Sequence, residues 1–290
     1  MSNFLITGSE GQLGRCFQAV AQEFPEHQLI FAKKDKVDLT LPVTFEKAYQ
    51  SKSFDGIINC AAYTHVDQAE EEPLLAHRIN VGGIKNIIDF AHEKALSVIH
   101  FSTDYVFNGL SPKSYKEDSI IQPINTYGSS KFQGEEIIKM ASCPHIIIRL
   151  SWLFSPFGKN FVKTILKLSE VKKTIQVVND QYGRPTYGID LARIVLSNIS
   201  KPDFFDFNSY NYAMQGTTTW FDFASKIIAI KKSTCQIKSC STAEYPTLAK
   251  RPKHSVLETK RIENHLSLNI PSWEDSLKRC LKRIDNNEKI

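Results

Sequence analysis

Short apolar runs alternate with helical patterns through the first half of this 290-residue chain. The runs are rich in β-branched residues and too short to be buried helices, so each is predicted to be a strand that a helix connects to the next. This alternation favours the α/β class, with a doubly wound parallel sheet. The expected strands are residues 4–6, 28–32, 56–59, 98–101 and 145–150, and the expected helices are residues 12–24, 44–51, 74–94 (one or two helices) and 127–141.

The spacing becomes less regular after residue 151. We expect a smaller α/β lobe over residues 151–290, built onto the sheet of residues 1–150, with part of its chain free to return to that sheet. Its expected elements are a helix near 161–168, a strand at 175–178, helices at 191–197 and after the threonines 217–219, a proline-bounded loop at 245–252 and a terminal helix at 273–284.

The composition is that of an ordinary globular protein, with 42% hydrophobic and 23% charged residues. It excludes collagen-like, disordered and membrane-spanning classes, and the net charge of +5 does not indicate nucleic acid. The N-terminus lacks the features of a signal peptide, so we expect a cytoplasmic protein. The six cysteines form no Cys-x-x-Cys pair and no zinc-ligand pattern, which favours reduced thiols over disulfides or a metal site.

Three glycines follow the first strand directly and open the first helix: Gly8, Gly11 and Gly14. Glycines at such a turn let a pyrophosphate approach the backbone, while the helix N-terminus supplies free amides and a partial positive charge. Three spaced glycines alone are a weak signal, because an ordinary tight turn needs them too. The strand before them and the helix after them favour a dinucleotide site.

The second strand ends in Lys33 and Lys34 instead of an acidic residue. A carboxylate there would accept hydrogen bonds from the ribose hydroxyls of NAD, whereas two ammonium groups suit the 2′-phosphate of NADP. The alternative is a solvated basic turn, since exposed lysines are common. Asp38 is a separate candidate for the adenine edge.

Tyr127 and Lys131 stand four residues apart on an expected helix, which places phenol and ammonium on one face. An adjacent cation favours the phenolate and eases proton exchange with a substrate oxygen. Such a pair also arises by chance on an unremarkable helix face. The context adds Thr103 and Asp104 where the strand 98–101 ends, a place where function concentrates, although a simple Ser/Thr/Asp turn would look the same.

The order and spacing of these motifs resemble the extended short-chain dehydrogenase/reductase superfamily. Further blocks resemble the dTDP-4-dehydrorhamnose reductases, the last enzymes of dTDP-L-rhamnose synthesis, and the resemblance runs from about residue 3 to 284. The blocks lie at residues 61–70, 102–107, 127–135, 149–152, 160–161, 179–186 and 249–252. The resemblance is specific to this family, because several of these blocks fall in the second lobe and not only in the cofactor half.

The resemblance implies a Rossmann-type NAD(P)-binding domain over residues 1–150 and a substrate-binding lobe over 151–290. NADPH would reduce the C4 ketone of a dTDP-4-dehydro sugar, giving a precursor of cell-surface polysaccharides such as O-antigen. Tyr127 would donate the proton, Lys131 would lower the pKa of the tyrosine and hold the ribose, and Thr103 would hydrogen-bond the same substrate oxygen.

The implied binding residues fall into two groups. The cofactor would contact Gly8, Gly11, Gln12, Leu13, Gly14, Lys33, Lys34, Asp38, Leu39, Ala61, Ala62, Tyr63, Thr64, Tyr127 and Lys131. The sugar nucleotide would contact Val66, Thr103, Asp104, Trp152 and Arg251. For Trp152 the alternative is simple core packing, and for Arg251 it is an exposed loop position.

Two departures from the family pattern matter. Some relatives carry a carboxylate just after the third glycine that helps to bind Mg²⁺ between subunits, but Arg15 and Cys16 stand here. We therefore expect no metal there, and a homodimer stays open without that support. The lysine pair favours NADPH, with NADH as the alternative.

Two other functions stay open on the sequence. One is the reduction of another nucleotide-linked 4-keto-6-deoxy sugar. The other is a non-catalytic NADP-binding subunit, because the regulatory subunit of methionine adenosyltransferase is similar in fold. The intact Thr103, Tyr127 and Lys131 count against the second.

Overall fold

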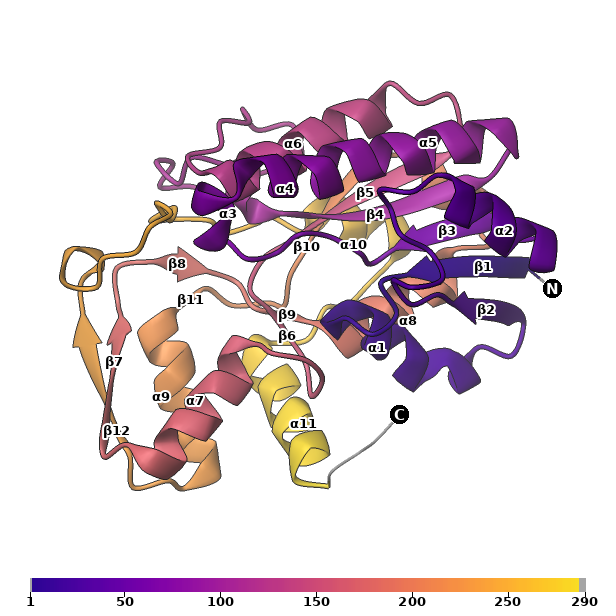
Figure 1. Cartoon of the computed structure of the whole chain (residues 1–290). Coiled ribbons are helices and arrows are strands. Elements are labelled where there is room, and N and C mark those ends of the chain that lie inside the picture. The colour runs from indigo at the N-terminus through magenta and orange to yellow at the C-terminus, as the bar shows by residue number, and fades with distance from the viewer. Residues whose placement is uncertain (1, 287–290) are drawn as a thin grey trace.

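A sheet of six parallel strands organises the computed structural model, which describes residues 2–286 (Figure 1). The strand order is β10-β5-β4-β3-β1-β2, and every neighbouring pair is parallel. The strands are β1 (Ser2–Thr7), β2 (His27–Phe31), β3 (Gly56–Asn59), β4 (Ser97–Thr103), β5 (His145–Leu150) and β10 (Ser209–Tyr212). The predicted α/β class with a doubly wound parallel sheet is confirmed.

Helices cover both faces of this sheet. On one face, apolar side chains of α2 (Val43–Ser51), α5 (Gly83–Glu93) and α6 (Thr126–Lys139) share a core with the strands. On the other face, α1 (Gln12–Val20) and α8 (Gly188–Asn198) belong to a larger core that continues into the second lobe. Figure 1 shows α2, α5 and α6 along one side of the sheet and α1 and α8 on the opposite side.

The second lobe packs beside the carboxyl ends of the strands. It contains α7 (Phe161–Val171), α9 (Trp220–Lys231) and α11 (Trp273–Asp285) with the parallel pair β7 (Thr174–Val178) and β12 (Gln236–Cys240). Two short pairs lie between this lobe and the sheet: β6 (Leu153–Phe154) with β9 (Thr186–Tyr187), and β8 (Tyr182–Gly183) with β11 (Thr218–Thr219). The remaining helices are η1 (Ala21–Glu23), α3 (Gln68–Glu71), α4 (Pro73–His77), η2 (Arg78–Gly82), η3 (Asp104–Val106), η4 (Pro202–Phe205), η5 (Thr242–Glu244) and α10 (Lys260–Leu266).

Most expected elements of the first half lie where the sequence placed them, and β3 and β5 match residue for residue. The expected helix 12–24 ends at Val20 and continues as the 3₁₀ turn η1. The expected helix 74–94 is divided, because the π-helical segment η2 separates α4 from α5. Strand β10 was not predicted, and through it the chain beyond residue 150 returns to the sheet, where β10 pairs with β5.

The thiols of the described chain lie mostly in its interior. All six cysteines are free, and five of them are buried. Within residues 2–286, no helix has the length and apolarity that crossing a membrane requires.

A buried ion pair joins α6 to β5. Arg149 donates from Nε and Nη2 to the carboxylate of Glu135, with the Nη2–Oε2 distance at 2.7 Å, and its Nη1 donates to the carbonyl of Glu117 at 2.9 Å. Both side chains are 1% exposed or less. Charges in such a site need their partners, because removing one leaves the other uncompensated in a low-dielectric interior.

We expect Glu135→Gln to lower the free energy of unfolding by about 3 kcal/mol, since it leaves the Arg149 guanidinium without its counter-ion. Urea denaturation followed by circular dichroism measures the loss. The matched control is Glu136→Gln on the same helix, whose partner Lys139 is exposed, and we expect less than about 0.5 kcal/mol there. Equal losses in the two variants would contradict this account.

Candidate active site

A cleft of about 1000 Å³ opens at the carboxyl ends of β3, β4 and β5, between the sheet and the second lobe. Its lining comes from the start of α1, the loop after β3, the ends of β4 and β5, the face of α6 and the aromatic residues of the lobe. A smaller cavity of about 290 Å³ adjoins it and shares Gly11, Cys60, Ala61 and Ala62. This is the edge of a parallel sheet at which ligands of α/β proteins bind.

The three glycines of the first turn have different structural roles. Gly8 has φ +62°, and a Cβ there would lie 2.7 Å from the backbone of Ala61. At Gly14 a Cβ would lie 2.4 Å from the carbonyl oxygen of Gly8, so this position serves close packing of helix and turn. Gly11 lines both cavities. Only a glycine avoids strain at a left-handed position such as Gly8.

The predicted reactive side chains meet in the large cleft. Tyr127 on α6 and Thr103 at the end of β4 both line it. Burial raises the pKa of Tyr127 to about 12, a side-chain hydrogen bond with Thr103 lowers it, and the carboxylate of Asp104 raises it further. The phenol therefore carries its proton at neutral pH, as an acid catalyst must.

Lys131 lines the same cleft but is directed at the sheet. Its Nζ lies 2.7 Å from the carbonyl oxygen of Phe101, to which it donates, and 2.9 Å from Nε2 of His100. Burial lowers the pKa of Lys131 to about 7, and Glu135 opposes this shift. That Lys131 lowers the pKa of the Tyr127 phenol stays a prediction.

Asp104 is a buried carboxyl beside the reactive phenol. Its Oδ2 has no hydrogen-bond partner, and the hydroxyl of the neighbouring Ser102 has none either. Burial raises the pKa of Asp104 to about 7, although hydrogen bonds with Ser255 and Thr103 work against the shift. Unpartnered polar atoms on a cleft wall are groups that a polar ligand can satisfy.

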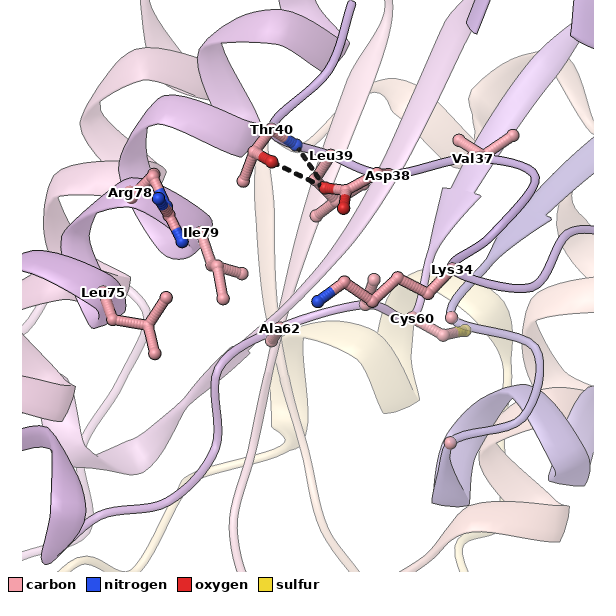
Figure 2. A pocket seen from close by; sticks show the side chains of 13 residues that line it. Lys34, Val37, Asp38, Leu39, Thr40, Cys60, Ala62, Leu75, Arg78 and Ile79 are labelled. Carbon is pink, nitrogen blue, oxygen red and sulfur yellow. Dashed lines mark hydrogen bonds between the residues drawn. The ribbon is translucent and has the colours of Figure 1, made fainter. Parts of the chain in front are cut away.

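The smaller cavity has a polar rim of both signs (Figure 2). Lys34 and Arg78 enter it from opposite sides, and Asp38 lies above it. Asp38 accepts hydrogen bonds from the backbone and hydroxyl of Thr40, each at 2.8 Å. Burial works to raise the pKa of Asp38, but these bonds, Lys34 and Arg78 lower it overall. This carboxylate is therefore ionised at neutral pH.

Aromatic residues form the wall on the lobe side. Trp152 follows β5 with a left-handed φ of +48°, and its ring stacks on that of Trp220 with centroids 3.7 Å apart. Phe161 lies 4.5 Å from Trp220, and all three side chains line the cleft. A non-glycine residue in this conformation is strained, and strain of this kind concentrates at functional sites.

An ion pair bridges the loop after β12 to the loop before α3. Arg251 Nη2 lies 2.6 Å from Oδ2 of Asp67, and Oδ1 of the same carboxylate accepts from the backbone of Ala249. Arg251 lines the cleft, but its guanidinium already has a carboxylate partner.

The structure brings most of the sequence-predicted site residues together. The large cleft is lined by Gly11, Gln12, Leu13, Ala61, Ala62, Thr64, Val66, Thr103, Asp104, Tyr127, Lys131, Trp152 and Arg251. The smaller cavity adds Gly8, Lys34, Asp38 and Leu39.

Three predicted residues line neither cavity: Gly14, Lys33 and Tyr63. Lys33 is on the surface, where its Nζ pairs with Glu10 at 2.8 Å. The phenol of Tyr63 donates to Glu72.

Sequence reasoning missed Arg78, Phe161 and Trp220 as lining residues. On a helix a charged residue resembles a solvated face and an aromatic residue resembles core, so Arg78 and Trp220 carried no signal. Phe161 stands in the family-like block at residues 160–161, but it was not singled out as a binding residue. Among the described residues, no group of three or more His, Cys, Asp or Glu side chains could hold a metal ion.

Comparison with known proteins agrees over nearly the whole chain. The family described as "RmlD substrate binding domain" matches residues 2–286. The dTDP-4-dehydrorhamnose reductase of Aggregatibacter actinomycetemcomitans is 35% identical over 287 residues, which are 96% of this chain and 98% of that protein. The Salmonella typhimurium reductase is 34% identical, over 96% and 97%.

A solved structure is also similar. The dTDP-4-dehydrorhamnose reductase of Bacillus anthracis, in complex with NADP, has a TM-score of 0.92 and 35% identity, and the match covers 97% of this chain and 99% of that one. The family predicted from the residue blocks is thereby confirmed: this chain belongs to the dTDP-4-dehydrorhamnose reductase family.

Proposed function

We propose that the chain reduces the C4 ketone of dTDP-4-dehydro-L-rhamnose to dTDP-L-rhamnose with NADPH. The observation that carries this proposal is the meeting of Tyr127, Thr103 and Lys131 in one cleft, between a dinucleotide-type turn and an aromatic wall. Family membership over residues 2–286 supports the substrate class.

The residues present fit a dinucleotide. Gly11 faces both cavities without a side chain, and the α1 N-terminus behind it supplies amides for a pyrophosphate. Ala61 and Ala62 leave room along the cleft floor. Lys34 and Arg78 provide positive charge for a 2′-phosphate in the smaller cavity, beside Asp38 for the adenine edge. When bound, the reduced nicotinamide supplies the hydride.

Side chains of this protein would supply the proton that the reduced ketone oxygen takes up. Tyr127 holds its proton at neutral pH and can give it to an oxygen that develops negative charge in the cleft. The Thr103 hydroxyl, hydrogen-bonded with that phenol, can stabilise the same oxygen. Because Lys131 lies on the same helix one turn away, its charged form would stabilise the tyrosinate that remains.

The sugar nucleotide would lie toward the second lobe. Asp104 and Ser102 offer unpartnered polar atoms to sugar hydroxyls, and Trp152 offers an apolar wall. Arg251 can serve a diphosphate only if it shares or leaves its Asp67 partner. We accordingly propose that residues 1–150 carry the cofactor and that residues 151–290 carry most of the sugar contacts.

Two alternatives belong to the test. The same machinery would serve another nucleotide-linked 4-keto-6-deoxy sugar, because Val66 and Trp152 shape the pocket only in part. A non-catalytic NADP-binding subunit would bind cofactor without oxidising it.

We also propose a cytoplasmic location, which the six free cysteines support.

We expect Tyr127→Phe to lower kcat at least ~100-fold, since it removes the proton donor and leaves the ring in place. The measurement is the loss of NADPH absorbance with dTDP-4-dehydro-L-rhamnose. The control is Tyr49→Phe, which removes a phenol from the α2 core away from both cavities and should keep the parent rate. An unchanged rate in Tyr127→Phe would remove this phenol from the mechanism, and no oxidation by the parent protein would favour the binding subunit.

We expect Lys34→Ala to raise the Kd of NADPH about 10-fold while changing that of NADH little, because one charge facing a phosphate is worth about one to two kcal/mol. Fluorescence titration of the reduced cofactor measures both constants. Lys33→Ala is the matched control, since Lys33 pairs with Glu10 outside the cavity. Equal losses for both cofactors would defeat the phosphate assignment.

The buried carboxyl of Asp104 predicts a pH effect on stability. Its pKa in the fold is raised from 3.8 to about 7, so it weakens the fold as pH rises through that window. We expect Asp104→Asn to gain about 2.5 kcal/mol of stability relative to the parent between about pH 5 and about pH 8. Urea midpoints at the two pH values test this, and a pH-independent difference between the proteins would contradict it.

A further inference from the structure

A chain of hydrogen bonds crosses three strands and ends at Lys131. The Thr7 hydroxyl donates to Oδ1 of Asn59 at 2.6 Å. Nδ2 of Asn59 lies 3.0 Å from Nδ1 of His100, and Nε2 of His100 lies 2.9 Å from Nζ of Lys131. All four residues are 2% exposed or less.

Strand register builds this row. Thr7 pairs with Asn59 across β1 and β3, and Asn59 pairs with His100 across β3 and β4. Residues opposite each other in parallel strands point to the same face, here the face that α6 covers. The row therefore belongs to the sheet, and Lys131 reaches it from the helix above.

The direction of the hydrogen bonds is fixed at Asn59. The backbone N–H of Ala61 points at Oδ1 of Asn59 at 3.2 Å, and a backbone amide can only donate. The atom that it faces is therefore the carbonyl oxygen, and the other atom of the side chain is the NH₂ group. An NH₂ group also only donates, so Nδ1 of His100 must accept and carries no proton.

The bare Nδ1 determines the protonation of Nε2 of His100, and Nε2 in turn influences that of the Lys131 amine. A neutral imidazole whose Nδ1 is bare carries its proton on Nε2, and Nε2 faces Lys131. An ammonium group has no acceptor site, whereas a neutral amine accepts with its lone pair and still donates to the carbonyl of Phe101. A charged Lys131 would place two N–H groups against each other in a buried site.

We propose that His100 is a positioning residue that favours the neutral amine over the ammonium form of Lys131, with Asn59 setting the required imidazole tautomer. This deepens the proposed function, on which the role of Lys131 rests. Burial lowers the pKa of His100 well below its usual value, and a charged Lys131 would lower it further, so the imidazole stays neutral. Burial also lowers the pKa of Lys131 to about 7, so near neutral pH the amine is divided between its neutral and charged forms.

The elements packed against α6 carry other ionisable groups. They are Arg78 from η2, His77 from α4, Glu70 from α3, Lys85 and Asp89 from α5, Asp104 and Tyr105 from η3, and Arg149 from β5, beside Tyr127 and Glu135 of α6 itself. Lys85 and Asp89 are exposed and pair with each other. Glu135 raises the pKa of Lys131, but it is bound to Arg149. His100, from β4, is the titratable side chain in hydrogen-bond contact with Nζ.

The decisive measurement is the tautomer of His100 in the unmodified protein. Long-range ¹H–¹⁵N correlation spectra of ¹⁵N-histidine protein distinguish a bare Nδ1 from a protonated one, and the His100→Gln spectrum assigns the signal. We expect the Nε2–H tautomer from about pH 5 to about pH 9. A protonated Nδ1 or an imidazolium in this range would overturn the proposal, whether or not the chain reduces the sugar.

A substitution at Asn59 can also reverse the donor and acceptor directions of the hydrogen bonds that run from Asn59 through His100 to Lys131. Asn59→Asp replaces the NH₂ group by an acceptor, so His100 should move its proton to Nδ1 and accept from a charged Lys131. We expect the alkaline limb of kcat/KM to move up by at least about one pH unit, together with the tautomer change.

His100→Gln tests the hydrogen-bond direction at Lys131 without the extra negative charge that Asn59→Asp introduces. It offers Lys131 a carbonyl without a new carboxylate, so we expect the same upward direction. His92→Gln on the exposed face of α5 is the control and should leave the limb in place. If the His100 tautomer and the alkaline limb are both unchanged in Asn59→Asp, the positioning role of His100 is refuted. A uniform loss of activity at every pH in folded His100→Gln would refute it as well.

Discussion

Parallel pairing in register brings the ends of β1, β3, β4 and β5 to one edge of the sheet, and the candidate site depends on this pairing. It places the glycine turn, the alanines after β3 and Thr103 around one cleft. The same register aligns Thr7, Asn59 and His100 beneath α6. A slip by one residue would turn these side chains to the other face, so the geometry of the site is a property of the sheet.

Burial is the second determinant, because it acts on each ionisable group of the cleft according to its neighbours. Tyr127 keeps its proton, Asp104 titrates near neutral pH and Lys131 is weakened as a base. By contrast, Arg149 is buried with a carboxylate partner of its own. The buried face of α6 thus carries two basic environments: an Arg149–Glu135 ion pair that holds the helix to the sheet, and a Lys131 amine without a bound carboxylate. Groups whose pKa values shift in opposite directions within one cleft are typical of acid and base chemistry.

Much of this arrangement could be predicted from the sequence, and the exceptions have physical causes. The strands of the first half have strong apolar patterns, so β3 and β5 were placed residue for residue. Strand β10 reads Ser-Tyr-Asn-Tyr, a polar segment that becomes a strand only because tertiary contacts bury it beside β5. Motif spacing singled out Tyr127 and Lys131, and the structure brings both into one cleft. It could not reveal that Lys33 pairs with Glu10 while Lys34 and Arg78 enter the cavity, because side-chain direction depends on packing.

The return of β10 to the sheet has a consequence for how the chain can be divided. A fragment ending after β5 would leave the backbone groups of that strand unsatisfied along an apolar edge, since residues 145–150 are buried throughout. Exposed edges of this kind pair with other molecules and aggregate. The two halves are therefore interleaved rather than joined end to end, and evolution by simple exchange of the substrate lobe would have to carry the sixth strand along with it.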